Sequence, residues 1–75
     1  MIPLKFIHGV RQLVVNKGHP KIYTSYIQYM LNENKSLINS MCQNDLPDDK
    51  IIQMLSEHVI DNYKKYSIGD RLNKN

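Results

Sequence analysis

The residues that could carry chemistry in this chain are one cysteine and three histidines. Cys42 could act as a nucleophile, and His8, His19 and His58 could act as bases or as metal ligands. Cys42 has no catalytic motif around it, and the histidines lack the short, regular spacing of metal-binding motifs. We therefore expect no catalytic site and no metal site, and we interpret Cys42 as a small, partly buried hydrophobic residue.

Two adjacent carboxylates, Asp48 and Asp49, could suggest acid–base chemistry. Neighbouring residues of a helix point to different faces, however, and acids after a proline such as Pro47 are typical of a first helical turn. The three glycines are isolated and form no phosphate-binding loop. We expect no enzyme, no cofactor and no small-molecule substrate.

Charged residues divide the chain into three blocks. Residues 1–30 contain four bases and no acid, residues 31–62 contain six acids and two bases, and residues 63–75 contain four bases and one acid. The net charge is +3. The basic first block could bind phosphate groups or an acidic partner, but the simplest interpretation is that it faces the acidic middle of its own chain or of a second copy.

Length and composition indicate one small soluble domain with a single core. It has 75 residues, of which 41% are hydrophobic, and its single cysteine excludes an internal disulfide. No apolar run reaches the ~18 residues of a membrane span, and the start does not resemble a signal peptide, so we expect no membrane association and a cytoplasmic location. Phe, Tyr, Met, Ile, Asn and Lys together number 35, against 8 for Gly, Ala, Arg and Pro, which indicates an AT-rich genome such as that of a low-GC bacterium, a phage or another virus.

The elements that would position these residues follow from hydrophobic spacing. Steps of three and four residues join the first apolar positions, which are Phe6, Ile7, Val10, Leu13 and Val14. This spacing predicts a helix over residues 3–17, which Gly18 would end in a left-handed conformation. The alternative is a short hairpin that turns at His8 and Gly9, because the flanking residues also suit strands.

Helical spacing continues over residues 20–43, with a polar interruption at residues 32–35. The sequence is compatible with one long helix or with two helices, the second of which would have Ser36 as N-cap. A further helix is predicted from Pro47 to about Ser67, with Gly69 as the residue after its end. Residues 70–75 read as a polar tail beyond a single domain of residues 1–69.

These elements predict an all-α fold, a small bundle of three or four short helices. Some apolar residues of the last helix lie at the margin of its main stripe and would form a second apolar face if exposed. The expected protein interface comprises Ile51, Met54, Ile60, Tyr63 and Tyr66. The alternative is that the stripe is wide because neighbouring helices pack on two of its sides.

Residues 10–31 resemble the general helix-turn-helix pattern. Residues 10–17 would end the first helix, Gly18 and His19 would form the turn, and residues 20–31 would be the recognition helix. Val14, His19 and Pro20 depart from the residue types usual in that pattern. The resemblance implies that the side chains facing nucleic acid are Arg11, Lys17, Lys21, Thr24, Ser25 and Gln28.

The sequence thus leads to two hypotheses of function. The first is a small, non-enzymatic helical binding module that modulates a larger protein partner or self-associates through an apolar helix face. The alternative is a nucleic-acid-binding regulator that uses the basic first thirty residues.

Overall fold

The computed structural model describes residues 2–73, with side chains for residues 2–65. Within this range the chain contains helices and no strand, so the all-α prediction is confirmed and the hairpin alternative is wrong. The helices are α1 (Leu4–Asn16), α2 (Thr24–Glu33), α3 (Lys35–Gln43) and α4 (Asp48–Asn73). These four helices agree with the predicted bundle of three or four.

The start and end of α1 agree with the sequence pattern. Pro3 precedes the first turn, and its carbonyl accepts the first amide hydrogen bond. At the other end Gly18 has a φ of 91°, and its N–H donates to the Val15 carbonyl at 3.0 Å. The His19 N–H donates to the Val14 carbonyl at 3.0 Å. This pair of bonds is the Schellman motif, so the predicted glycine stop is confirmed.

Residues 20–43 form two helices, which decides between the two alternatives. The break is at Asn34, whose side-chain Nδ2 donates to the Met30 carbonyl at 2.7 Å. The predicted restart with Ser36 as N-cap is wrong, because Asn34 itself precedes α3 and Ser36 lies inside the helix. The same asparagine side chain thus satisfies a carbonyl at the end of α2 that has lost its helical partner.

The connection between α1 and α2 is longer than predicted. Residues 17–23 are outside both helices, and α2 begins at Thr24 and not at Pro20. Within this loop Ile22 is buried in the core. The loop therefore contributes to packing, because it buries an apolar side chain. Residues 20–23, which the sequence predicts as the start of the helix, lie outside it.

The start of α4 agrees with the prediction. The carbonyl of Pro47 accepts hydrogen bonds from the Lys50 and Ile51 N–H groups, both at 3.1 Å. Asp48 and Asp49 occupy the first turn, where negative charges interact favourably with the helix dipole and stabilise the helix.

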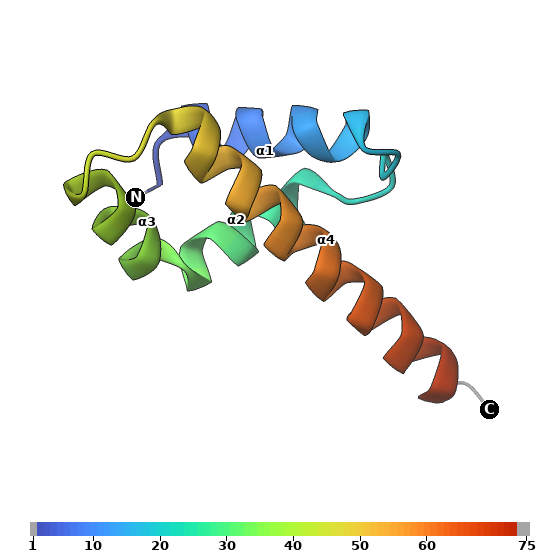
Figure 1. Ribbon diagram of the computed structural model, residues 1–75. Helices are drawn as coiled ribbons and strands as arrows, with labels where there is room; N and C mark the ends of the chain where they lie inside the picture. The colour runs from blue at the N-terminus through green and yellow to red at the C-terminus, as the bar shows by residue number, and fades with distance from the viewer. Residues whose placement is uncertain (1, 74–75) are drawn as a thin grey trace.

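The predicted end of α4 near Ser67 is wrong. The helix continues through Gly69 to Asn73, because a glycine inside a helix costs only about 1 kcal/mol relative to alanine and does not by itself end it. Four residues of the predicted polar tail are therefore helical, and residues 74–75 lie outside the described range. The last part of α4 projects from the other helices, which gives dimensions of 46 × 24 × 17 Å (Figure 1).

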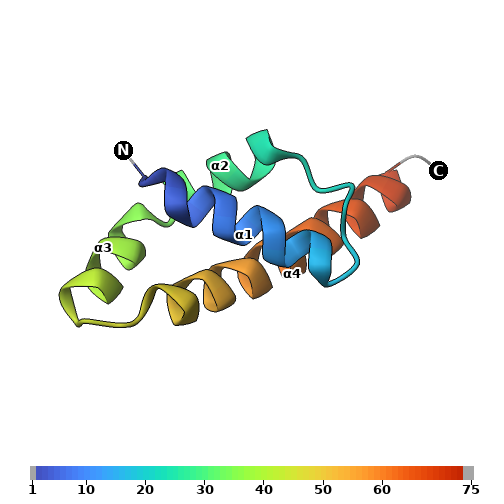
Figure 2. The ribbon, with the colours of Figure 1, turned by 90° about the horizontal axis from the view of Figure 1, so that it is seen from above.

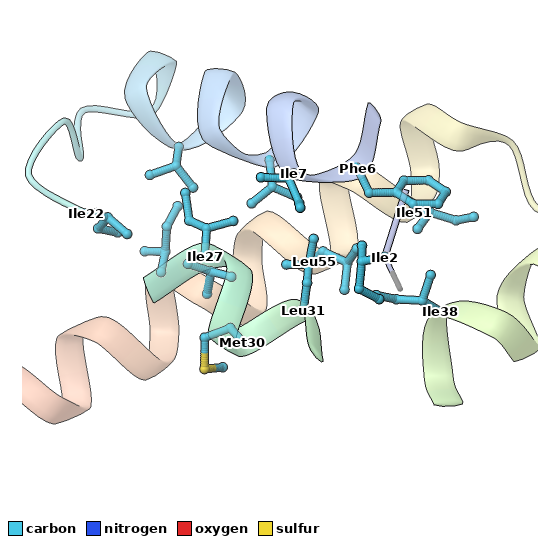
Figure 3. Close-up of a cluster of buried hydrophobic side chains, with 14 of the residues drawn as sticks. Ile2, Phe6, Ile7, Ile22, Ile27, Met30, Leu31, Ile38, Ile51 and Leu55 are labelled. Atoms are coloured by element: carbon cyan, nitrogen blue, oxygen red, sulfur yellow. The ribbon is translucent and has the colours of Figure 1, made fainter. Parts of the chain in front are cut away.

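One apolar core lies between the helices. α4 packs against both α1 and α2, and α2 packs against α1 and α3. Figure 3 shows side chains from all four helices pointing to a common centre. The buried apolar residues are Ile2, Phe6, Ile7, Val10, Val14, Ile22, Ile27, Met30, Leu31, Ile38, Met41, Ile51, Leu55, Val59 and Ile60.

Candidate functional site

The structure does not bring the cysteine and the histidines together. Cys42 is exposed in the last turn of α3, so the prediction that it is partly buried is wrong. The reason is that Ile38 and Met41 turn the apolar face of this short helix to the core and leave Cys42 at its edge. Among the described residues no three side chains of the His, Cys, Asp and Glu types are grouped as a metal site would require.

The predicted interface on α4 is largely inside the molecule. Ile51 is 0% exposed and Ile60 is 7% exposed, so neither can belong to a surface face. The physical reason is the alternative noted from the sequence, because α1 and α2 pack against two sides of α4 and widen its buried stripe. Tyr63 is half-buried, and its ring meets that of Tyr26 edge to face, with centroids 5.9 Å apart. Tyr66 lies outside the described side chains.

Met54 is the predicted interface residue that is on the surface, with 50% of its side chain exposed. Helical spacing puts Lys50 and His58 next to it on the outer face of α4, and both are exposed. Met54 is therefore a single apolar side chain among polar ones. A single exposed apolar residue of this kind is ordinary on protein surfaces.

All six side chains predicted to face nucleic acid are exposed, but their arrangement differs from the helix-turn-helix pattern. The turn of that motif has 3–4 residues, whereas residues 17–23 separate α1 from α2 here. Lys21 lies in this loop, and Thr24 and Ser25 form the first turn of α2. The recognition helix proposed from Pro20 onward is therefore wrong.

Part of the basic first block faces acids of the same chain. Lys5 Nζ lies 3.0 Å from Asp48 Oδ2, which joins the start of α1 to the start of α4. A surface hollow near the other end of α1 is lined by Lys17, His19, Glu57, Ile60, Asp61 and Lys64. The Lys5–Asp48 ion pair supports the intramolecular interpretation of the charge blocks, and the hollow places Lys17 near two acids without an ion pair.

One face of α1 is turned away from the core and lies on the surface. Steps of four, three and four residues align Leu4, His8, Arg11 and Val15, and we call this line the α1 ridge. Leu4 is 65% exposed and Val15 is 43% exposed. The two apolar side chains thus lie at the ends of the ridge, and the two nitrogen-bearing side chains lie between them.

Next to the ridge a groove runs between α1 and α4. Its apolar lining consists of Gly9, Leu13 and Ile52, all partly buried, and we call it the α1–α4 groove. Four polar residues also line it, namely Gln12, Asn16, Asp48 and Asp49. Figure 2 shows the molecule from above, with α1 in front of α4, against which it packs.

A second apolar hollow lies on the other side of the ridge, between α1 and α2. It is lined by Ile2, Leu4, Ile7, Gln28 and Asn32. Leu4 therefore borders this hollow while it also ends the ridge, and Gln28, predicted to contact nucleic acid, lies at an apolar surface.

The residue that could have pointed to this face is Gly9, in the middle of a helix. Glycine at such a position costs about 1 kcal/mol relative to alanine, and it allows another segment to approach the backbone closely. Which segment approaches, and the groove that results, depend on tertiary packing.

No described helix is long and apolar enough to cross a membrane. Comparison of the chain with protein-family models, with curated proteins and with solved structures finds no match.

Proposed function

We propose that this chain is a small, non-enzymatic helical binding module that acts by contact with protein, through the α1 ridge and the α1–α4 groove. The observation that carries the proposal is the exposure of Leu4 and Val15 on a helix face beside an apolar groove with a polar rim. Apolar surface rimmed by polar residues is typical of protein-binding sites. The interface thus moves from the outer face of α4, where the sequence placed it, to α1.

The partner is a larger protein that the module modulates, or another copy of the module. In either case the exposed cation Arg11 lies at the centre of the ridge and would meet a negative group. Aliphatic side chains at the ends of the ridge would supply the apolar contact.

Nucleic acid is the second candidate, because Arg11, Lys17 and Lys21 are exposed and residues 2–32 contain no acid. Two observations count against it. Lys17 shares a hollow with Glu57 and Asp61, and the loop before α2 is too long for a helix-turn-helix turn. Fluorescence anisotropy of labelled DNA and RNA over a salt series tests this candidate, since several phosphate contacts give a steep loss of affinity with salt.

The proposal itself is tested by photo-crosslinking in cells that produce the protein. A photoreactive amino acid replaces Gln12, which is exposed on the groove rim, or Asn39, which is exposed on α3. We expect a protein adduct from position 12 and none from position 39. Equal labelling from both positions, or an adduct with nucleic acid alone, would contradict a protein-binding role for this face.

A further inference from the structure

We infer that the α1 ridge binds an acidic segment of another protein, one that carries an apolar side chain at a fixed distance from a carboxylate. This inference rests on the proposed function and states the chemistry of its partner. The ridge has an apolar hollow at one end and a hollow with a cation at the other, and no acid is among the residues that line either of them. The charges of the surface and the spacing of the two hollows together define the partner.

The apolar hollow lies between α1 and α2 at the Leu4 end of the ridge, and we call it the α1–α2 hollow. Ile2 and Ile7 are 7% and 8% exposed, so they form its base, and Leu4 borders it on the surface. Gln28 and Asn32, both exposed, line it from α2. Side-chain amides donate and accept hydrogen bonds. The hollow can therefore take an apolar side chain and bond the peptide backbone next to it.

The second hollow lies along the rest of the ridge, and we call it the Arg11 hollow. Its lining is exposed and belongs entirely to α1, and consists of His8, Arg11, Gln12, Val15 and Asn16. Among the side chains described for residues 2–65, Arg11 has no ion-pair partner. A guanidinium presents a planar fork of N–H donors that matches a carboxylate. This hollow therefore fits a carboxylate from outside the molecule.

The geometry of α1 sets the distance between the two groups of the partner. Leu4 and Arg11 lie on one line of the helix, seven residues apart, which corresponds to about 10 Å. An extended segment covers this distance in about three residues, and a helix that lies along α1 covers it in about seven. The partner segment thus has a bulky apolar residue and an Asp or Glu at one of these separations.

The charges around the ridge favour an acidic segment and set its position. Residues 2–32 contain no acid, so α1 and the α2 side of the ridge do not repel carboxylates. Asp48 and Asp49 line the α1–α4 groove, on the other side. Like charges therefore keep an acidic segment out of that groove and on the α2 side of the ridge. A nucleic acid would also meet Arg11, but it has no apolar side chain for the α1–α2 hollow.

The test is selection of a phage-displayed library of random peptides on the purified protein. Peptides of about 12 residues are long enough, because a helix of that length spans the ridge from Leu4 to Val15. We expect enrichment of peptides in which Leu, Ile, Met or Phe lies about three or about seven residues from Asp or Glu. The absence of enrichment, or an enriched pool without acids at a fixed separation, would overturn the inference.

Substitutions at the two ends of the ridge locate the binding of the most enriched peptide, which is synthesised, labelled and titrated by fluorescence anisotropy. Arg11→Glu should weaken binding by about tenfold or more, because it places a negative charge against the carboxylate. Leu4→Ser should weaken it by about tenfold, because it removes apolar contact at the other end. A peptide that binds either variant as tightly as the wild type would contradict the two-point contact.

Matched controls come from α3. Lys35→Glu makes the same change in charge at an exposed cation, and Leu37→Ser removes a leucine that is 51% exposed. Both should leave the affinity unchanged, and far-UV circular dichroism checks that every variant keeps its helicity. Equal losses in the control variants would show that net charge or general hydrophobicity decides binding, and would remove the ridge as the site.

Labelled duplex DNA is titrated against the same variants. A DNA affinity that falls with Arg11→Glu and not with Leu4→Ser, together with no enriched peptide, would assign the ridge to nucleic acid and overturn the inference.

The photo-crosslinking experiment separates failure of this inference from failure of the proposed function, because Gln12 lines both the α1–α4 groove and the Arg11 hollow. A protein adduct from position 12, together with a selection that enriches no acid, leaves the binding module standing and removes the acidic segment as its partner. The absence of both a protein adduct and an enriched peptide removes both.

Discussion

Gly9 of α1 and Ile52 of α4 lie so close that a methyl group on Gly9 would be 2.5 Å from Ile52 Cδ1 and 3.0 Å from its Cγ1. A contact of this length forces the isoleucine or the helices to move. The glycine therefore allows α1 and α4 to approach each other and shapes the groove between them. Its value lies in packing, which offsets its unfavourable effect on helix formation.

Gly9→Ala should consequently destabilise the protein although alanine is the better helix former. Overpacking costs about 1–3 kcal/mol, against a gain of about 1 kcal/mol in helix propensity. Urea unfolding measures the difference in the free energy of unfolding. In an Ile52→Ala background the same change should be neutral or stabilising, and an equal loss in both backgrounds would show that the contact is not the cause.

Gly18→Ala tests the left-handed end of α1. Nothing lies within 4 Å of a Cβ added there, so any loss of stability comes from the φ of 91° alone. We expect a loss of about 1–2 kcal/mol, the cost of this conformation for residues with a Cβ. Gly18→Asn should lose less, since asparagine tolerates the left-handed region, and the order of the two variants in thermal unfolding is the measurement.

Ser56→Ala should not destabilise the protein. Ser56 is 0% exposed, and its hydroxyl donates to the carbonyl of Ile52 at 2.7 Å, one turn back in the same helix. Removal of the hydroxyl leaves no buried partner unsatisfied, because that carbonyl belongs to the α4 ladder, and alanine favours the helix by about 0.5 kcal/mol. Ser56→Leu should instead cost about 1–3 kcal/mol by overpacking, and chemical denaturation compares the two.

Ile60→Asp and Met54→Asp should separate the core side of α4 from its surface side. An aspartate at buried position 60 loses apolar burial and places a charge in the core, so the chain should unfold or lose at least about 3 kcal/mol. The same change at half-exposed Met54 should cost no more than about 1 kcal/mol. Circular dichroism and thermal melting are the readout, and similar losses at both positions would contradict the orientation of the helix.

Lys5→Met should have a small effect that salt removes. Lys5 and Asp48 are 60% and 50% exposed, so their pair contributes about 0.2–1 kcal/mol at low ionic strength. The difference from wild type in the free energy of unfolding should shrink at about 1 M salt, where the screening length is about 3 Å. A difference that is the same at both ionic strengths would point to packing of the lysine stem over Phe6, whose ring centroid lies 5.3 Å from the ammonium.

The elements that the sequence predicts correctly are those with a local cause. The end of α1 at Gly18 and the start of α4 after Pro47 depend on the backbone preferences of those residues. The sequence does not decide whether the helix breaks at Asn34, because an asparagine can lie inside a helix or end one. Its bond to Met30 is visible only once the chain turns there.

The candidate site could not be predicted in the same way. Helical spacing shows which residues of α4 share a face. The number of neighbouring helices decides how wide the buried part of the helix surface is. Two helices pack on α4, so the buried part is wide enough to include Ile51 and Ile60. The groove depends on residues 9 and 52, which are far apart in the sequence and show no joint pattern. Gly9 is compatible with a close approach to α1, but the sequence alone equally allowed it to be the turn of a hairpin.

The packing of α1 on α4 also has a consequence for synthesis. Within the described residues, α1 is synthesised before α4, which is its main partner. Until α4 emerges from the ribosome, Phe6, Val10 and Val14 have no helix to cover them on that side, and α2 and α3, of 10 and 9 residues, are too short to be stable alone. The core of these four helices therefore forms only after α4 has been made.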